Sequence, residues 1–525
     1  MRSFFILVSL VLLVSCNNFL EENPKSEIAI DRYFSTPDHA RSVVNNLYRS
    51  GVLSFYDSDD HYGGTPLMYG GYISGLFAND IYKGQRPISQ YPPLLTHTSK
   101  NISSEMDIVW NNCYITIARA NTAIKYISST PGLEESECNQ LIATAKFFRA
   151  YNYFFLVKFF GDVPLITEPY ESLENLYVSR TAAKDVYTQI IQDLKDALTG
   201  GLINDTFVNN GFRITQSVVE TVLANVYLQM SGYPILEDHY ADAAQMARNV
   251  IKSGVHKLVE NGSTPERSAY NILRTSDTES EFIYTKEYVV NIAEQRWIEF
   301  SFPPEGSSLG IFKYPATTNV YKPSTTIINC YDPVEDLRIQ EKQFFFRTYT
   351  YVKNGEEQTL DLGEYCNWFW YDENAMLVTG HCEKDLPIYR YAEVLLFAAE
   401  AIANSEGVTP EAVRYLTDVR ARAYTSVDRS KIEAELSSLS KDDFIHEVWS
   451  ERLRELPLEC KVWDDIQRTR MYPVTSDKNP GKVTFVPIVG ATNPYGATYK
   501  ERDLLWPISD NEIQRNPNLE QNLGF

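Results

Sequence analysis

The hydrophobic pattern is densest between residues 144 and 165, where apolar side chains occupy nearly every side of a predicted helix. Within its central part only an arginine, Arg149, an asparagine and a lysine interrupt the run from 147 to 160. A helix that is apolar on all sides has to be buried on all sides, and this one is too short and too charged to span a bilayer. We therefore predict a central helix surrounded by others, in which Arg149 is buried and paired.

Other segments repeat apolar residues at helical spacing and follow one another in pairs. The predicted helices are 36–50, 103–128, 135–160, 181–200, 215–231, 240–254, 387–405, 410–423 and 441–456. Small residues such as Ala224 and Ala243 let antiparallel helices approach closely, as in a loose tetratricopeptide repeat. The pattern predicts a mainly α fold, a tetratricopeptide-like array of helical hairpins that buries the central helix.

Two stretches, 51–100 and 255–385, lose the helical period and are rich in glycine and aromatic residues. In the second, residues 344–352 have the pattern of a short strand that turns at Asn354-Gly355. We interpret this stretch as an irregular lobe of loops and short strands, inserted between helical pairs. The resulting division of the chain is 1–15, 16–35, 36–254, 255–385 and 386–525.

Residues 1–15 have the pattern of a secretory signal peptide. Arg2 gives a positive start, residues 4–14 form an apolar run too short to span a membrane, and Leu-Val-Ser precedes Cys16. This ending is similar to a bacterial lipobox, which implies cleavage before Cys16, lipidation of Cys16 and a short tether at 16–35. The alternative is an ordinary signal peptide followed by an incidental cysteine.

Charge and cysteine content narrow the classes of partner. The chain has 48 Lys and Arg against 69 Asp and Glu, a formal net charge of −21 over 525 residues. Nucleic-acid binding requires a basic face, so we predict no nucleic-acid partner. The 35 tyrosines favour surfaces that offer a flat ring and a hydroxyl. After Cys16 we expect free thiols, although spacing alone leaves a Cys366–Cys382 bridge open.

Catalytic and metal motifs find little support. Residues 306–310 satisfy G-x-S-x-G, but prolines flank them where a nucleophile elbow needs a strand and a helix. Asp57, Asp59 and Asp60 lack the spacing of a calcium loop, and the seven histidines form no HExxH. We predict no catalytic residue, no metal and no cofactor. A glycosidase-type carboxylate pair stays open, because no motif selects one among the 69 acids.

Several short motifs, in this order along the chain, resemble the SusD/RagB family of nutrient-binding lipoproteins of Bacteroidetes. They are Cys16, Arg149-Ala-x-x-Tyr153-Phe154 with Gly161-Asp162-Val163-Pro164-Leu165, Asp336-Leu337-Arg338, Tyr391-Ala392-Glu393, Glu451-Arg452, and the tail from Trp506 to Asn522. The resemblance implies an all-helical fold around tetratricopeptide-like units, with an irregular lobe that carries ligand. It also implies an outer-membrane, cell-surface location and a TonB-dependent SusC-like transporter as partner. Pro457 departs from the family pattern and should bend or end the helix before it.

Ligand contacts are expected where the two irregular, aromatic-rich stretches contribute to one site. Flat aromatics can hold the C–H faces of a sugar, and polar groups can hold its rim. The predicted ligand-binding residues are Tyr69, Tyr72, Asp80, Tyr82, Arg86 and Trp297. The predicted function is that of a lipoprotein, not an enzyme, which binds a glycan or oligosaccharide nutrient and delivers it to the transporter. The alternatives are a glycan-cleaving hydrolase of the same uptake system and a purely structural tetratricopeptide-like scaffold.

Overall fold

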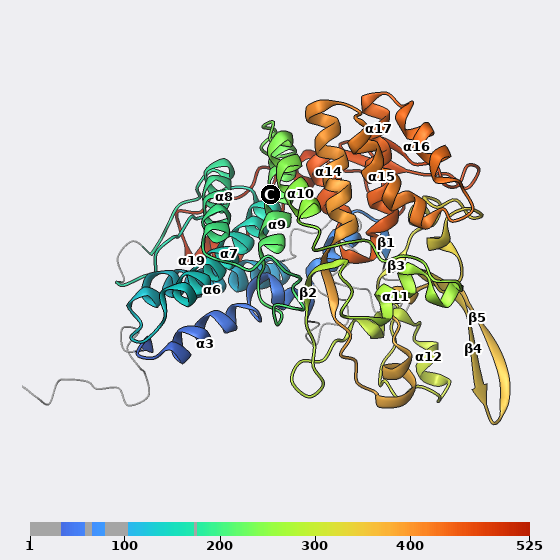
Figure 1. Ribbon diagram of the computed structural model, residues 1–525, viewed down its shortest axis with the longest axis horizontal. Helices are drawn as coiled ribbons and strands as arrows, with labels where there is room; N and C mark the ends of the chain where they lie inside the picture. Colours follow the sequence, from blue (N-terminus) through green and yellow to red (C-terminus); the bar gives the residue numbers. More distant parts are fainter. Residues whose placement is uncertain (1–32, 58–65, 79–102, 173–175) are drawn as a thin grey trace, which may run out of the picture.

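The computed structural model describes residues 33–57, 66–78, 103–172 and 176–525. Helices dominate it, and Figure 1 shows them as neighbouring hairpins with an irregular lobe at the lower right. The longer helices are α3 (Pro37–Leu47), α6 (Ser103–Tyr126), α7 (Glu135–Phe160), α8 (Ala183–Thr199), α9 (Gln216–Ser231), α10 (Tyr240–Ser253), α14 (Tyr391–Glu406), α15 (Pro410–Ala423), α16 (Arg429–Ser437), α17 (Lys441–Glu455) and α18 (Val462–Thr469). Shorter ones are α4 (Tyr69–Ile73), α11 (Ala269–Thr275), α12 (Glu305–Ser308), α13 (Thr325–Ile328) and α19 (Asp510–Arg515).

The long helices pack against one another in chain order. Helix α6 contacts α7, α7 contacts α8, and the succession continues through α9 and α10. Helix α10 then contacts α14, which in turn packs on α15 and α17. The helices before and after the lobe therefore join into one array, although the lobe separates them in sequence. This is the predicted mainly α, tetratricopeptide-like architecture.

Helix α7 is the predicted central helix, and every side chain from Phe147 to Phe160 is buried. Its arginine is paired as expected. Arg149 Nε and Nη2 each donate to one carboxylate oxygen of Asp193 at 2.7 Å, and Nη1 donates to Asn121 Oδ1 and to the Thr167 carbonyl. This guanidinium connects α6, α7 and α8, so a buried charge is used as a clamp between helices.

The described strands form two-stranded antiparallel ladders. Their pairs are β1 (Phe77–Ala78) with β3 (Lys322–Pro323), β2 (Phe282–Lys286) with β6 (Leu386–Arg390), β4 (Phe345–Lys353) with β5 (Glu356–Asn367), and β7 (Met471–Val474) with β8 (Thr484–Pro487). The predicted hairpin at 344–352 is confirmed as β4 and β5, which project at the right edge of Figure 1. Asn354 and Gly355 both have positive φ, as a tight hairpin turn requires.

One predicted helix boundary is wrong and another is confirmed. The helix expected from residue 387 begins only at Tyr391, because residues 386–390 form β6 and are all buried against β2. Apolar residues of a short strand and of a helix start cannot be distinguished by periodicity alone. Helix α17 ends at Glu455, and Pro457 opens a short 3₁₀ helix, as the proline predicted.

The lobe has a small core of its own. It consists of Ile298, Phe302, Tyr314, Phe346, Tyr349, Cys366, Trp368, Tyr371, Ala375, Met376 and Cys382. Cys366 and Cys382 both belong to this core, and both are free thiols. The lobe is joined to the first irregular stretch through the pairing of β1 with β3. The two aromatic-rich stretches are therefore neighbours in space, which decides where a site between them can form.

Candidate functional site: a cleft beside α6

A cleft of about 400 Å³ opens between α6 and the segment that follows α3. Its volume lies in the lower part of the range typical of small-molecule sites, roughly 300–1,000 Å³. The opposite wall is η1 (Gly51–Tyr56), a 3₁₀ helix, and Pro66 and Tyr69 close one end. The cleft thus lies at the boundary between the helical array and the first irregular stretch.

One face of α6 supplies the first wall. Ile108, Asn112, Ile115 and Arg119 follow each other at intervals of three and four residues, which places them on one side of the helix. Ile115 is 48% exposed, whereas Val109 on another face is fully buried. This wall combines an exposed aliphatic side chain with an amide and a guanidinium, a mixture suited to a ligand with both C–H and polar groups.

The second wall is held in place by the central helix. Asn152 Oδ1 of α7 accepts a hydrogen bond from the Val52 amide at 3.1 Å. At Gly51, where φ is +61°, a Cβ would lie 2.0 Å from that same oxygen, so glycine is required by both conformation and space. Across the cleft, Asn112 Nδ2 donates to Ser54 Oγ at 3.3 Å. The cleft wall therefore depends on a polar residue of the buried helix.

Two exposed arginines, Arg49 and Arg119, line the cleft. Arg49 Nη2 donates to the Glu287 carbonyl at 3.0 Å, and Arg119 Nη1 donates to Asn46 Oδ1 at 2.9 Å. Neither forms an ion pair with a carboxylate of the described residues. Asp57 also lines the cleft, but its carboxylate lies 3.5 Å from the Lys286 ammonium. The charged groups at this cleft are therefore predominantly cationic donors.

The second wall is also bonded to the lobe. The Tyr56 carbonyl accepts hydrogen bonds from Tyr288 Oη at 3.0 Å and from Trp297 Nε1 at 2.7 Å. Nearby, Tyr72 Oη donates to the Val320 carbonyl at 2.9 Å. These bonds bring the two irregular stretches into contact, and the expectation that both contribute to one ligand site stays a prediction. Aromatic side chains of these stretches are therefore used in the contact between them.

Three predicted ligand residues are buried in this structure. Tyr72 is 0% exposed and Trp297 is 3% exposed, and the polar atom of each is bonded to a backbone carbonyl. As packed, neither ring offers a face to a glycan, because both anchor one irregular stretch on the other. Tyr69 lines the cleft but is only 2% exposed. The predicted site residues outside the described residues are Asp80, Tyr82, Arg86 and Cys16, whose roles stay predictions.

Sequence reasoning missed the residues that line the cleft on α6 and beside η1. It gave priority to aromatic residues in loops, whereas Arg49, Asn112 and Arg119 are polar residues at or near helices. The available signal was the repeat at 108, 112, 115 and 119, a mixed face opposite the buried face of the same helix. That repeat indicates a surface without saying that an opposing wall makes it a cleft.

Two neighbouring carboxyl groups, those of Glu287 and Asp385, lie near the bond between Arg49 and the Glu287 carbonyl. Glu287 follows β2 and Asp385 precedes β6, and the register of Lys286 with Leu386 places the two side by side. Burial, with the neighbouring Asp385 carboxylate, raises the pKa of Glu287 to about 8. Burial and the charge of Asp277 raise the pKa of Asp385 to about 7. Both carboxyl groups therefore change their protonation state near neutral pH.

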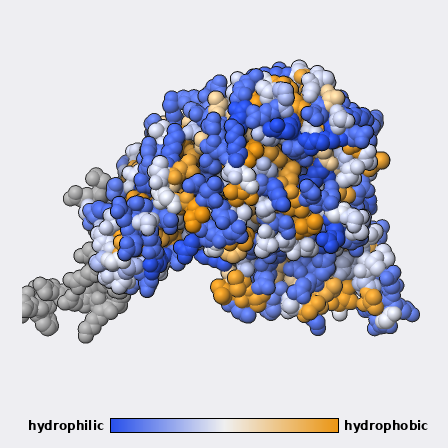
Figure 2. Space-filling model, viewed as in Figure 1, coloured by the Kyte–Doolittle hydropathy of each residue, from blue (hydrophilic) through white to orange (hydrophobic). Residues whose placement is uncertain are grey.

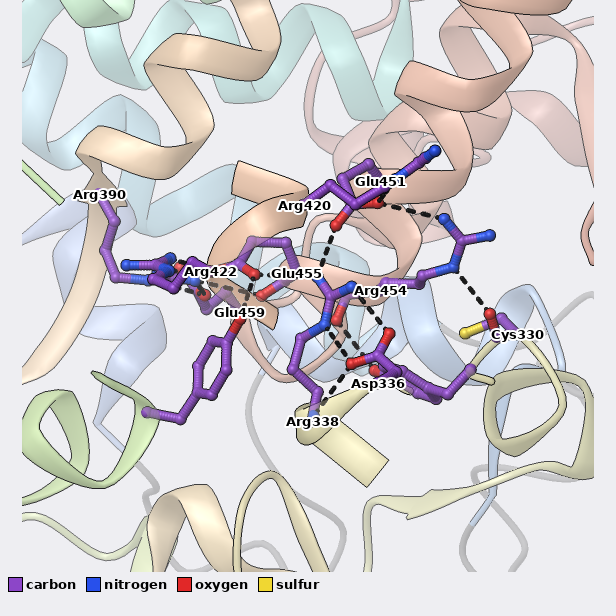
Figure 3. A network of polar contacts seen from close by, with 12 residues as sticks. Cys330, Asp336, Arg338, Arg390, Arg420, Arg422, Glu451, Arg454, Glu455 and Glu459 are labelled. Atoms are coloured by element: carbon purple, nitrogen blue, oxygen red, sulfur yellow. Dashed lines mark hydrogen bonds and ion pairs between the residues drawn. The ribbon is translucent and has the colours of Figure 1, made fainter. Parts of the chain in front are cut away.

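A second concentration of charge lies beneath α14, α15 and α17, and Figure 3 shows it as a network of arginines and acids. Arg338 Nη1 donates to Glu451 at 2.8 Å and to Glu455 at 3.0 Å, and its Nη2 donates to Asp336. All four side chains are 0% exposed. Against burial, which acts to raise it, the surrounding arginine charges hold the pKa of Glu451 below its usual value. A ligand cannot reach this network, so its role is structural.

An apolar surface lies at the edge of the lobe. Figure 2 shows hydrophobic patches along the lower margin of the lobe, and the exposed apolar side chains of the lobe include Val289, Ile292 and Val378. Their loops are joined by His381 and Glu294, whose Nδ1 and Oε2 lie 2.8 Å apart. This surface lacks the convergent hydrogen-bonding groups that a sugar site needs, so it ranks below the cleft as a ligand site.

The described part of the chain contains neither a metal-binding cluster nor a nucleophile elbow. No group of three or more His, Cys, Asp or Glu side chains is placed there to hold a metal ion. Ser308, which occupies the serine position of the G-x-S-x-G motif, is the last residue of the four-residue helix α12. This is not a strand-turn-helix elbow. Within the described ranges, none of the helices has the length and apolar content to cross a membrane.

Comparison with known protein families agrees with this fold. The model of the SusD family matches residues 335–525. A SusD-like model, described as starch-binding associating with outer membrane, matches residues 84–228. Between them the two matches span more than half of the chain. The chain belongs to the SusD family. Within this SusD-family chain, the α6 wall of the cleft lies inside the second match, whereas Arg49 and Ser54 lie outside both.

Relatives of this SusD-family chain extend over almost its full length. A SusD-like protein of Formosa agariphila is 24% identical across 100% of this chain and 98% of its own. A SusD superfamily protein from Parabacteroides distasonis has a TM-score of 0.80 at 28% identity, covering 93% of this chain and 99% of that one. Surface glycan-binding protein A from Bacteroides uniformis shares the fold, with a TM-score of 0.68 at 18% identity over 93% and 99% of the two chains.

Proposed function

We propose that this protein is a cell-surface glycan-binding lipoprotein, and that the cleft beside α6 contacts the glycan. The observation that carries the proposal is the composition of the cleft. Exposed Ile115 offers an apolar surface, while Ser54, Asn112 and two arginines offer hydrogen bonds on both sides of it. Family membership supports the ligand class, as does the fold shared with surface glycan-binding protein A.

Binding without cleavage is the activity that this cleft supports. Hydrolysis of a glycosidic bond needs two carboxyl groups about 5–9 Å apart on either side of the bond. Among the described residues that line the cleft, Asp57 is the one carboxylate, and Lys286 lies beside it. The described lining of the cleft thus supplies one carboxyl group, whereas a general acid–base mechanism on a glycosidic bond uses two. We therefore favour a binding protein over the alternative of a hydrolase.

The proposed location is the outer-membrane surface, with a lipid anchor at Cys16 and a tether at 16–35. The family description, associating with outer membrane, supports the location. A protein held there by lipid has to pass its ligand to another protein, and we propose a SusC-like TonB-dependent transporter as the recipient. Residues 36–254, 255–385 and 386–525 would form the helical, lobe and C-terminal parts of this surface receptor.

The decisive test of binding uses a polysaccharide panel with two readouts. Affinity gel electrophoresis measures retardation by each glycan, and a reducing-end assay measures cleavage. We expect retardation with no released ends, and Ile115→Asp should abolish it because the variant puts a charge on the apolar contact surface. Val334→Asp serves as the control, since Val334 is 83% exposed and lies outside the cleft. Multiple turnover, or full binding by Ile115→Asp, would contradict the proposal.

The anchor has its own test. Cys16→Ala should leave the fold intact and release the protein from membranes, because lipid chains on this residue are the proposed attachment. Circular dichroism checks the fold, and carbonate washing of membrane fractions checks the attachment. Retention of the variant on washed membranes would show that another contact holds the protein.

A further inference from the structure

We propose that the cleft is selective for an anionic glycan, with Arg49 and Arg119 binding its carboxylate or sulfate groups. This inference rests on the proposed function, since it assigns a chemical class to the ligand of the same cleft. It is carried by the placement of two exposed guanidinium groups at one cleft, each without a carboxylate partner among the described residues.

Arginines that are paired with carboxylates elsewhere in the chain contrast with these two. Arg149 binds both oxygens of Asp193, and Arg338 binds Asp336 and Glu451. Arg49 and Arg119 each donate a single N–H to a neutral oxygen. A guanidinium carries five N–H donors in a fixed fork that matches the two oxygens of a carboxylate or sulfate. The remaining donors of both arginines are therefore available for such a group.

Among the described residues that line the cleft, the summed charge is opposite in sign to that of the whole protein. The chain carries a formal net charge of −21, so an anionic polymer would be repelled by most of its surface. Among the described residues that line the cleft, Asp57 is the one acid and lies 3.5 Å from Lys286, so the two arginines outnumber the acids there. A neutral glycan can gain only hydrogen bonds from these arginines, whereas an anionic glycan also gains attraction between opposite charges.

The wall between the arginines fits a sugar that carries such a charge. Arg119, Ile115 and Asn112 belong to one face of α6, so a ring packed on Ile115 has the guanidinium one helical turn away on one side and the amide on the other. Arg49 approaches from the end of α3, on the opposite wall. Charged groups on successive residues of a glycan can therefore contact different arginines.

The test uses oligosaccharides in matched charged and neutral forms, measured by isothermal titration calorimetry with the full-length protein. Oligogalacturonate and oligoalginate supply carboxylates, and carrageenan oligosaccharides supply sulfates. Their carboxyl-reduced and desulfated forms supply the neutral counterparts. We expect at least one charged form to bind about tenfold or more tightly than its neutral counterpart, the loss typical of a hydrogen bond to a charged group. Binding of the carboxylated or of the sulfated oligosaccharides then identifies the charged group that the cleft recognises.

Variants then assign the effect to the two arginines. Arg49→Met and Arg119→Met should each weaken binding of the charged oligosaccharide about tenfold and binding of the neutral form by a smaller factor. Arg119→Lys should retain part of the affinity, because the charge remains while the fork is lost. Arg414→Met, at an exposed arginine outside the cleft, is the matched control. Raising the salt concentration should weaken the wild type more than the double Met variant.

The outcomes separate this inference from the proposed function. Equal affinity for charged and neutral forms, or unchanged binding of the charged form by both Met variants, would overturn the anionic selectivity while glycan binding itself stands. Binding of neutral glycans alone would do the same. Failure of every charged and neutral glycan to bind would overturn both.

Discussion

The protein holds arginines in two opposite ways. In the network beneath α14, α15 and α17, Arg338 is fully buried and its donors meet three carboxylates. At the cleft, Arg49 and Arg119 are exposed and meet only neutral oxygens. The same side chain therefore serves stability in one region and, as we propose, recognition in the other. Burial and pairing, not residue type, distinguish the two roles.

The difference has an energetic basis. Moving a guanidinium out of water is unfavourable unless carboxylates and further hydrogen bonds replace the lost hydration. Once the network is formed, loss of one member leaves an uncompensated buried charge. An exposed arginine keeps its water and contributes little to folding, so its donors can be exchanged for those of a ligand. The comparison can be tested by changing one arginine at a time.

The largest effect is expected in the buried network. Arg338→Met should lower the free energy of unfolding by about 3–5 kcal/mol, because Asp336, Glu451 and Glu455 lose their shared partner. Urea denaturation followed by tryptophan fluorescence measures the change. Arg119→Met, the matched substitution at the cleft, should change the same quantity by less than about 0.5 kcal/mol. Similar losses in both variants would remove the distinction between the regions.

The buried clamp of the central helix should give the next largest effect. Arg149→Ala should cost on the order of 3 kcal/mol, since Asp193 is left buried with an unpaired charge. Adding Asp193→Ala to this variant should restore part of the loss, because no unpaired carboxylate remains. Thermal melting of the wild type, Arg149→Ala, Asp193→Ala and the double variant completes the double-mutant cycle. A melting temperature of Arg149→Ala close to that of the wild type would refute the role of the clamp.

The carboxyl pair behind Arg49 predicts a pH dependence. Glu287 and Asp385 have folded-state pKa values raised to about 8 and about 7, from ordinary values of 4.5 and 3.8. Between these limits the folded state binds more protons than the unfolded state, so stability falls as the pH rises from about 5 to about 8. Glu287→Gln should flatten this decline and stabilise the protein at pH 8 by on the order of 2 kcal/mol. Denaturation midpoints at several pH values measure the slope, and an unchanged slope in the variant would contradict the assignment.

The smallest effect concerns the cleft wall. Gly51 and Gly132 both have positive φ, but only at Gly51 would a Cβ collide with Asn152. Gly51→Ala should therefore cost about 1 kcal/mol more than Gly132→Ala and should also weaken glycan binding, because η1 has to move. Paired denaturation and calorimetry compare the two variants. If both variants lost the same stability and kept full glycan binding, the wall at Gly51 would have no role in the binding site.

Most of the fold could be predicted from the sequence because its signals are local. The all-round apolar character of α7, the Asn354-Gly355 turn and the stop at Pro457 each follow from a few neighbouring residues. The failure at residues 386–390 has a tertiary cause. Those residues form a strand because they pair with β2, which lies about a hundred residues earlier in the chain. The local sequence does not indicate such a distant partner.

The sequence indicated the approximate location of the candidate site but not the residues that line it. The two irregular stretches are in contact, but Tyr72 and Trp297 bury their rings in that contact. Aromatic residues in loops serve packing and recognition equally well, and sequence does not say which surface is covered. The cleft depends on Asn152 reaching Val52, a contact between residues one hundred positions apart. Its arginines became informative only once their partners were known.

The central claim is that the glycan binds in the cleft beside α6 and not on the other exposed surfaces of the chain. Hydroxyl-radical footprinting with mass spectrometry, using a glycan from the panel that binds, measures this directly. The account predicts protection of Ile115 and Pro66 at the cleft, with Ile292 and Val378 of the lobe edge reacting as in the free protein. Protection of the lobe edge, with Ile115 and Pro66 unchanged, would contradict it.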